Sequence, residues 1–458
     1  MNFYNILLFK KIYMNIPISI ICILNFLITF YSCQSPIKLH FESKLPIGVE
    51  TSYFLSNYYN QYLFTKIKIG SENQNLELSI KLNRYVTYII GSENSELKSE
   101  YFNEKNSKSY RQISTKEYES NEDEFFSSYK SEDNIYFGEN LFFKNFIFFL
   151  SQKKQIFDES GHIGLKMMPS FIDKNNFIGT SFISQLKSNN IINSQYFYFK
   201  YNTLNENEFK YDGNLIIGAS PHQIEENDLF QEKNFHEIYA KIDENYNSRW
   251  NIKFTKVNYG GENLDISDLC EFSTTFGLII APINFFLIYE KFFENKDCYG
   301  EYNGEDELKN FMYLFCDENV DISEFKDVEF LTEDKDIYFV LTYKDLFRKI
   351  GKYNYFLILF NKDINQWTFG HIFLNKYTIV FNAEKKTIGY YRVSNNDSND
   401  NKKNNYGVFI ALSITFLIII VGLVVYIFYF SPRNRKIRPN ELEEKFDYSP
   451  QDNNKLGI

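Results

Sequence analysis

Residues 62–80, YLFTKIKIGSENQNLELSI, decide the fold of this chain. From Leu63 to Ile69 every second side chain suits the buried face of a strand, and Lys66 and Lys68 lie at positions between these residues. The tetrapeptide GSEN at 70–73 interrupts this alternation, which resumes from Leu76 to Ile80. A period of two on both sides of a turn that contains Gly and Asn predicts a β-hairpin.

Short runs of the same kind recur along the chain, whereas helical patterns are few. Two short helices are predicted, over 182–187 and 283–293. The region between the two ends is therefore predicted to be mostly β, with a division between residues 200 and 215. The further predicted strands cover 135–150, 196–200, 214–217, 250–257, 337–341, 355–360 and 377–381.

The composition is that of a folded protein with an acidic balance. The chain has 458 residues, of which 44% are hydrophobic and 24% are charged. This length allows about two to four packed domains. Its 49 basic and 59 acidic side chains give a formal charge of −10. A phosphate-binding surface is disfavoured by this charge, so no nucleic acid partner is expected.

Residues 1–33 are predicted to be a secretory signal peptide. Lys10 and Lys11 precede an uncharged apolar run from Ile12 to Tyr31, and the pair Ser32-Cys33 closes it. A basic start, an apolar middle and small residues at the end are typical of such a signal. Because the run approaches the length of about 20 residues that spans a bilayer, an uncleaved anchor remains the alternative.

A second apolar stretch, residues 408–430, contains no charged residue and predicts a transmembrane helix. Four basic residues follow it between 433 and 438, so the positive-inside rule places the C-terminus in the cytosol. We expect a type I protein of the secretory or endolysosomal system or the cell surface. Residues 394–405 would form a stalk that carries Asn396 as a glycosylation candidate, and 431–458 a cytosolic tail.

Seven motifs, in this order and spacing, resemble the pepsin-like aspartic proteases, peptidase family A1. They include the opening hairpin, Gly161-His162-Ile163-Gly164-Leu165, Gly277-Leu278-Ile279-Ile280-Ala281-Pro282 and the closing stretch from Trp367 to Gly389. The remaining three are residues 182–197, 213–219 and 250–252. The resemblance covers roughly residues 58–393, which is nearly all of the chain between the two predicted membrane signals.

The resemblance implies a mostly β, bilobal acid-protease fold with two lobes of the six-stranded type. The N-terminal lobe would cover residues 34–205 and the C-terminal lobe 206–393. The family acts as endopeptidases through two aspartates that share one proton, one activating water and the other protonating the substrate. No metal or cofactor is expected, since the cysteines and the five histidines form no zinc-type spacing.

Both catalytic aspartates are absent when the family pattern is carried over residue by residue. The first catalytic loop falls on Lys81-Leu82-Asn83-Arg84 and the second on Ser273-Thr274-Thr275-Phe276. The dyad-equivalent residues are therefore Lys81 and Ser273, and the glycine of each loop is missing too. Tyr118 matches the tyrosine of the flap, without the glycines that follow it in the family.

Two interpretations of Lys81 and Ser273 remain open. A neutral Lys81 could activate Ser273 as a nucleophile, which would make a Ser-Lys dyad. Alternatively, both residues have drifted after catalysis was lost, and Lys81 turns to solvent or to a carboxylate. His371 stands where the family has an aspartate and is expected to be a loop residue with local hydrogen bonds.

Three of the five cysteines lie in the predicted lumenal part. Cys298 and Cys316 are spaced for a local disulfide in an oxidising compartment, and the resemblance implies one in the second lobe. Cys270 is then left without an assigned partner.

The function predicted from these features is that of a membrane-anchored pseudoenzyme. The chain would be a monomeric aspartic-type endopeptidase homologue that is inactive and at most binds an extended peptide or protein in its cleft. Two alternatives remain: a working endopeptidase with an atypical dyad, and a structural or adhesive surface protein that uses the fold only as a stable body.

Overall fold

The computed structural model describes thirteen segments of the chain. They are residues 35–44, 59–91, 101–118, 128–137, 141–151, 160–167, 181–202, 210–241, 249–266, 268–302, 311–332, 338–363 and 366–392. The predicted signal, stalk, membrane helix and tail, including Asn396 and residues 408–430, lie outside them. Within the described segments no helix is long and apolar enough to cross a membrane.

The predicted hairpin is confirmed as strands β2 (Tyr62–Ile69) and β3 (Gln74–Lys81). Ile69 pairs with Gln74 across the turn, and Gly70 there has a φ of 82°, a conformation that glycine adopts without strain. Leu63, Ile67 and Leu78 are buried, as the alternation requires.

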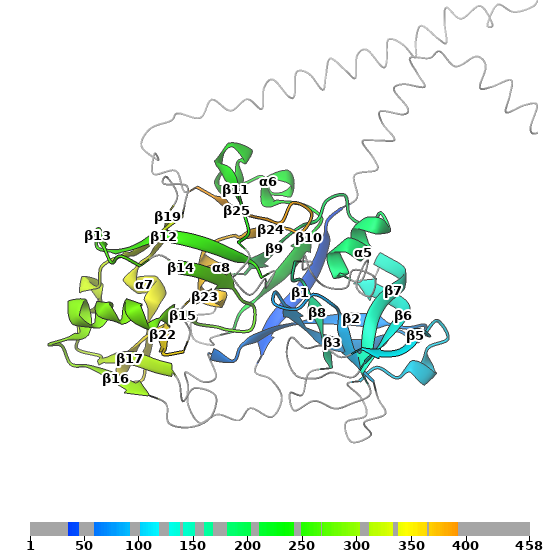
Figure 1. Cartoon of the computed structure of the whole chain (residues 1–458), viewed down its shortest axis with the longest axis horizontal. Coiled ribbons are helices and arrows are strands. Elements are labelled where there is room, and N and C mark those ends of the chain that lie inside the picture. The colour runs from blue at the N-terminus through cyan, green and yellow to red at the C-terminus, as the bar shows by residue number, and fades with distance from the viewer. Residues whose placement is uncertain are drawn as a thin grey trace, which may run out of the picture. The chain divides into compact units, whose positions relative to one another are not determined.

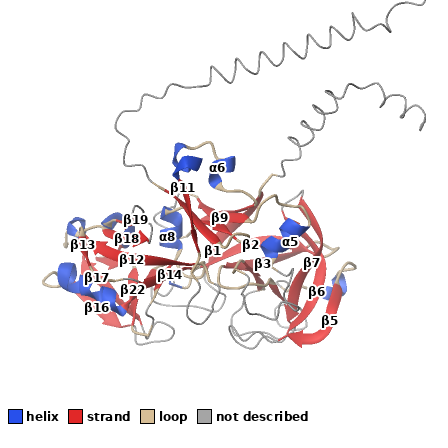
Figure 2. Ribbon diagram, turned by 45° about the horizontal axis from the view of Figure 1, so that its top comes forward, coloured by secondary structure: helices blue, strands red, loops and turns tan. Residues whose placement is uncertain are grey.

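The described chain is mostly β, and its strands form two sheets (Figures 1 and 2). The first sheet runs in the order β11-β25-β24-β9-β10-β1-β2-β3-β8-β4-β7-β6-β5. Besides the hairpin, its strands are β1 (Ile37–Lys44), β4 (Tyr88–Ile90), β5 (Arg111–Tyr118), β6 (Ser128–Phe137), β7 (Leu141–Ser151), β8 (Gly161–Gly164), β9 (Tyr196–Tyr201), β10 (Asp212–Ile217), β11 (Phe235–Tyr239), β24 (Val380–Asn382) and β25 (Thr387–Tyr391).

The second sheet runs in the order β19-β18-β12-β14-β23-β15-β22-β17-β21-β20, with β13 beside β12 and β16 beside β17. Its strands are β12 (Asn251–Tyr259), β13 (Glu262–Asn263), β14 (Asp268–Phe272), β15 (Ile279–Pro282), β16 (Cys298–Tyr302), β17 (Phe311–Asp317), β18 (Val328–Thr332), β19 (Tyr338–Leu341), β20 (Phe347–Ile350), β21 (Tyr353–Phe356), β22 (Ile358–Asn361) and β23 (Trp367–Phe369).

The helices are short and lie at the ends of strands (Figure 2). The predicted helix over 182–187 is confirmed as α5 (Phe182–Ser188). The helical segment predicted over 283–293 is confirmed, and it consists of a 3-10 helix (Ile283–Leu287) followed by a π-helix (Tyr289–Phe293). The others are α6 (Pro221–Ile224), α7 (Tyr343–Leu346), α8 (His371–Lys376) and 3-10 turns at Glu104–Asn106, Asp228–Phe230, Glu232–Asn234 and Ile322–Glu324.

The centres of the two sheets repeat one strand arrangement. In the first sheet β8 is parallel to β3 and antiparallel to β4, which is parallel to β7. In the second, β23 is parallel to β14 and antiparallel to β15, which is parallel to β22. Each sheet thus threads a late strand between two earlier ones. This repetition gives the bilobal, pepsin-like architecture that the motifs predicted.

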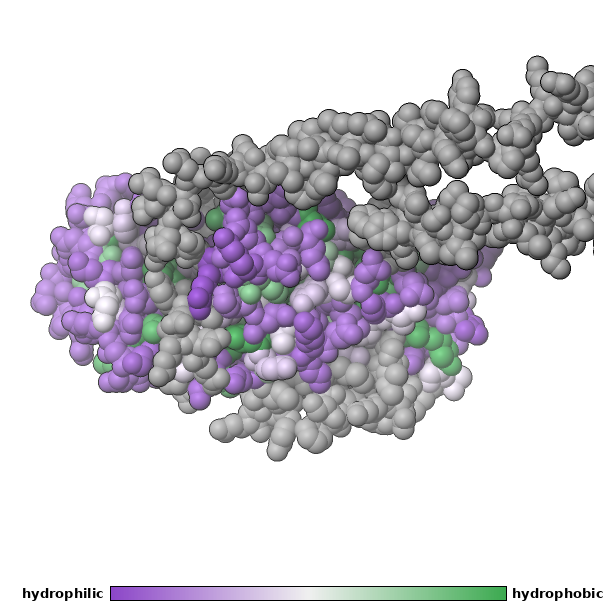
Figure 3. All heavy atoms as spheres, turned by 90° about the horizontal axis from the view of Figure 1, so that it is seen from above, coloured by the Kyte–Doolittle hydropathy of each residue, from purple (hydrophilic) through white to green (hydrophobic). Residues whose placement is uncertain are grey.

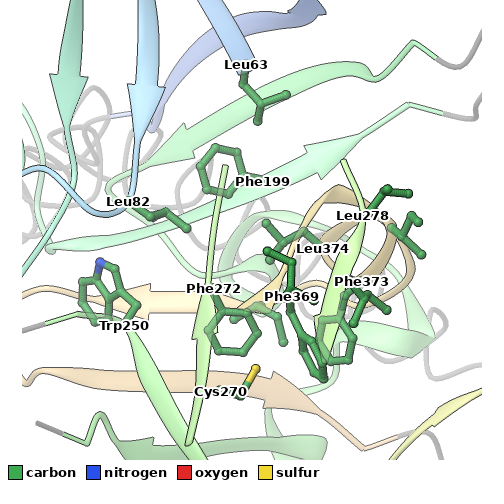
Figure 4. Packing of buried hydrophobic residues seen from close by; sticks show 14 of the residues in the cluster. Leu63, Leu82, Phe199, Trp250, Cys270, Phe272, Leu278, Phe369, Phe373 and Leu374 are labelled. Atoms are coloured by element: carbon green, nitrogen blue, oxygen red, sulfur yellow. The ribbon is translucent and has the colours of Figure 1, made fainter. Parts of the chain in front are cut away.

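Aromatic and aliphatic side chains from both sheets form one buried cluster. Trp250 and Trp367 are fully buried in it, and the Trp250 indole donates a hydrogen bond of 2.8 Å to the carbonyl of Leu165, the residue that follows β8. Leu82, from the segment after β3, belongs to the same cluster as Phe272 and Phe369 (Figure 4). The core therefore continues beneath both loops that follow β3 and β14.

Candidate functional site

The first candidate loop, Lys81–Arg84, is fixed by the strand threaded behind it. The carbonyl of Lys81 accepts a hydrogen bond from the amide of Leu165 at 2.9 Å, and that of Arg84 accepts one from Lys166 at 2.7 Å. A Cβ on Gly164 would lie 2.4 Å from the carbonyl oxygen of Val86, closer than any side chain permits. The loop backbone and β8 therefore approach each other in a way that requires glycine.

The second candidate loop, Ser273–Phe276, has the same support from β23. The amide of Ser273 donates to the carbonyl of Phe369 at 3.0 Å, and that of His371 donates to Phe276 at 2.9 Å. A Cβ on Gly370 would lie 2.2 Å from the carbonyl oxygen of Phe276. The two loops thus sit on equivalent backbone supports, each with one indispensable glycine.

Thr274 joins the two loops directly. Its hydroxyl donates to the carbonyl of Ile80 at 2.6 Å and accepts from the amide of Leu82 at 3.3 Å. These two bonds straddle Lys81, so the first loop meets the second at the residues next to Lys81 and Ser273. The first loop cannot return the interaction, because Leu82 stands at the matching position and has no hydroxyl.

Positive charge gathers at the first loop. Lys81 is half-buried, and its Nζ lies 5.3 Å from the centre of the Tyr62 ring. Burial, together with the nearby charges of Lys81 and Arg84, holds the pKa of His162 on β8 well below its usual value. A neutral His162 therefore lies beneath the two cations of the loop.

Ser273 is 4% exposed and bonded within its own loop. Its hydroxyl lies 2.9 Å from that of Thr275 and accepts the amide of Thr275 at 3.2 Å. Among the described residues, the hydrogen bonds of the Ser273 hydroxyl therefore go to Thr275. Neither loop contains a carboxylate, and the nearby Glu271 is paired with Arg249 at 2.6 Å.

His371 differs from the sequence-based interpretation. It is not a loop residue with local bonds but the first residue of α8, and it is fully buried. Its Nε2 donates to the carbonyl of Gln61 at 2.7 Å, and its Nδ1 accepts from the Tyr201 hydroxyl at 3.0 Å. Both partners are far away in sequence, so local pattern could not reveal them. Burial lowers the pKa of His371 to about 4, which keeps the ring neutral.

The flap candidate and the cysteines are placed as follows. Tyr118 ends β5 and pairs with Ser128 on β6, while residues 119–127 lie outside the described segments.

Cys298 and Cys316 are joined by a disulfide between β16 and β17. Cys270 is a buried free thiol. Among the described residues no three His, Cys, Asp or Glu side chains gather into a metal-binding group.

Sequence reasoning did not anticipate the bridge through Thr274 or the role of His371. The run of three hydroxyl residues from Ser273 to Thr275 was the available signal, since two of them now bond to each other and the third reaches the other loop. Asn83 and Thr275 stand where the family resemblance places the glycines of the two loops. Neither Asn83 nor Thr275 has a positive φ, so these positions do not strain the backbone.

Comparison with known proteins gives one clear match. The family model described as "Eukaryotic aspartyl protease" matches residues 61–393. This range contains both loops, the threaded strands and the disulfide. No curated protein matches the chain significantly.

Proposed function

The chain belongs to the eukaryotic aspartyl protease family, and we propose that it is a member that binds extended peptides without cutting them. The observation that carries this proposal is the Thr274 bridge, which joins the two loops at the residues next to Lys81 and Ser273 and so supports the alignment of both with the dyad. On that alignment the residues at the dyad positions are Lys81 and Ser273, and neither is an acid. A mechanism based on two carboxylates that share a proton has no groups to use.

The chemistry around both residues supports the same conclusion. The Ser273 hydroxyl is occupied by Thr275, whereas a nucleophile needs a base within hydrogen-bonding reach. General acid-base catalysis by one positioned group supplies a factor of about 10² to 10⁴. Both members of a cooperating pair are replaced here, so neither can compensate for the other.

Binding does not need the missing acids. An extended peptide is recognised largely through main-chain hydrogen bonds to exposed strands, and pockets for alternate side chains add specificity. The hairpin of β5 and β6 offers such a strand, because β5 pairs only with β6 among the described strands. The cations Lys81 and Arg84 would replace the negative charge that an active dyad presents to a substrate.

The proposal includes attachment to a membrane of the secretory system. The support is in the sequence: an uncharged apolar stretch at 408–430, flanked on its C-terminal side by basic residues. With the family domain on the lumenal or outer side, the cleft would meet peptides in an oxidising compartment, which suits the disulfide of Cys298 and Cys316.

A peptidase assay on the purified chain from acid to neutral pH tests the proposal, with a pepstatin-like inhibitor as the control for an aspartic mechanism. We expect no cleavage at any pH and retention of extended peptides on the immobilised chain. Cleavage that the inhibitor blocks would show a working aspartic site. Cleavage that resists it and disappears in Ser273→Ala would support the Ser-Lys alternative.

A further inference from the structure

The outer face of the second sheet carries a group of aromatic rings, which we call the tyrosine face. It consists of Tyr299 on β16, Tyr313 and Phe315 on β17, and Tyr353 and Tyr355 on β21. Phe315 is at its centre, with its ring centroid 5.4 Å from Tyr299, 5.9 Å from Tyr313, 5.1 Å from Tyr353 and 5.5 Å from Tyr355. Figure 1 places β16 and β17 at the opposite end of the domain from β5.

The strand register explains why these rings share one face. Tyr299 pairs with Phe315, which pairs with Tyr355, and the other rings lie two residues along the same strands. The alternate residues point inward, and among them Cys298 and Cys316 form the disulfide. The covalent bond thus fixes β16 against β17 directly beneath the rings.

Part of the tyrosine face is exposed to solvent. Tyr299 is 45% exposed and Tyr353 38% exposed, whereas Phe315 beneath them is 8% exposed. A contiguous group of exposed aromatic rings is uncommon on a protein surface and marks interaction sites. Figure 3 shows one face of the molecule, whose described part is largely hydrophilic with scattered apolar side chains.

Carboxylates surround the rings on the β16 side. The Tyr313 hydroxyl donates to Glu301 at 2.7 Å, and the Tyr299 hydroxyl lies 3.5 Å from a carboxylate oxygen of Asp317. The charge of Asp317 also raises the pKa of Tyr299. Cations also lie nearby: on β20, Arg348 pairs with Tyr355 and Lys349 bonds to Glu318, and the Lys362 Nζ lies 4.0 Å from the ring centre of Tyr302 on β16.

We propose that the tyrosine face binds an extended basic segment of a partner protein, with arginine or lysine side chains placed over Tyr299 and Tyr353 and beside Glu301 and Asp317. Exposed ring faces attract cations, and the adjacent carboxylates supply the complementary charge. Strand β16 pairs only with β17 among the described strands, so its outer edge can align an extended segment along the rings. This site is separate from the cleft and does not depend on the proposed function of the cleft.

Fluorescence anisotropy on the full chain tests the inference, with a labelled octapeptide of alternating arginine and serine as the probe. The same peptide with glutamate for arginine is the charge control. We expect binding of the arginine peptide only, weakening as salt is raised because the exposed carboxylates are screened. Equal binding of both peptides, or binding of neither, would overturn the inference.

Variants locate the binding on the rings. Tyr299→Ala and Tyr353→Ala should each weaken it by about two- to fivefold, the range for one exposed cation–π contact, while Tyr299→Phe keeps the ring and should bind nearly as well as the unmodified chain. Glu301→Lys should weaken binding further through like-charge repulsion. The matched control is Tyr239→Ala on β11, since Tyr239 is 74% exposed but lies outside the tyrosine face.

Two outcomes would contradict this placement. A loss in Tyr239→Ala as large as in Tyr299→Ala would show non-specific association. Retention of a neutral glucose oligosaccharide in place of the arginine peptide would show that the rings serve carbohydrate stacking, which is a different function.

Discussion

The loop after β3 and the loop after β14 rest on equivalent backbone supports but differ in what their side chains do. Each loop is hydrogen-bonded to a threaded strand or the residues just after it, and the last residue of β8 and the residue that follows β23 are glycines without room for a Cβ. The second loop bonds to itself through Ser273 and Thr275 and to the first through Thr274. The first loop instead contains Leu82, which is buried in the core, and the cations Lys81 and Arg84.

This difference separates the requirements of the fold from those of catalysis. Gly164 and Gly370, which match glycines of the family motifs, are positions where a side chain would collide with backbone atoms. The family residues that are replaced, at 81, 83, 273 and 275, are ones whose substitution leaves no positive φ and no steric conflict at the backbone. The residues that the family pattern keeps are those that packing requires, and the residues that differ from it lie where packing does not require the family's residue.

Placing a side chain at either threaded glycine should have the largest effect. Gly370→Ala and Gly164→Ala should each lower the free energy of unfolding by about 4 kcal/mol or more, because the new Cβ would meet carbonyl oxygens at 2.2 Å and 2.4 Å. Gly351→Ala is the control, since it has open space and a φ of 59°, and should cost only about 1 kcal/mol. Denaturant unfolding measures all three, and equal losses would contradict the steric argument.

Acidification should destabilise the domain through His371. Its pKa falls from 6.5 unfolded to about 4 folded, so between these values the unfolded chain binds a proton that the folded chain does not. Stability present above pH 6.5 is lost as the pH falls, by about 3 kcal/mol near pH 4. Buried His162 acts in the same direction.

The measurement that tests this prediction is the change in the free energy of unfolding with pH, not its value at any one pH. His371→Asn should flatten the slope between pH 6.5 and 4, whereas the exposed control His40→Asn should not. A slope unchanged in His371→Asn would show that this histidine does not titrate as its burial implies.

Breaking the bridge between the loops should have a smaller effect. Thr274→Val removes the hydroxyl and leaves the carbonyl of Ile80 and the amide of Leu82 without it, at a cost of about 2 kcal/mol. Thr255→Val is the control, because the Thr255 hydroxyl bonds to carbonyls at the surface, and should cost less than about 0.5 kcal/mol. Similar values for both variants in denaturant unfolding would mean that the bridge contributes little.

Restoring the acids should have the smallest effect. Lys81→Asp with Ser273→Asp should leave turnover at least about 10³-fold below the typical enzyme value of about 10 s⁻¹. The second loop retains donors on Thr275 for a new carboxylate, but Leu82 cannot complete the bridge from the first loop. Adding Leu82→Thr is the sharper variant, and robust activity of the double variant without it would contradict this reasoning.

The sequence predicted those parts of the fold in which pairing is local. The β2–β3 hairpin was visible because its two strands and its turn are contiguous, and alternation marked the buried face. The parallel pairing of β3 with β8 leaves no such mark, since the partners are about 80 residues apart, and only the family resemblance indicated it.

The site was predictable in position but not in detail. The resemblance aligned Lys81 and Ser273 with the dyad, but nothing local showed that Thr274 reaches Ile80 or that His371 reaches Gln61. Such contacts depend on how the two sheets pack against each other. No periodic pattern of hydrophobic residues in a single sequence indicates that packing. Whether Asn83 and Thr275 strain the two loops could not be predicted either, because φ is a property of the folded backbone.

The most direct test of the central claim is a count of new peptide ends. The unmodified chain is incubated with a peptide library from pH 3.5 to 7, and mass spectrometry compares it with Lys81→Ala and Ser273→Ala. The account predicts that all three samples match a sample without protein. New ends produced by the unmodified chain, and lost in either variant, would contradict it.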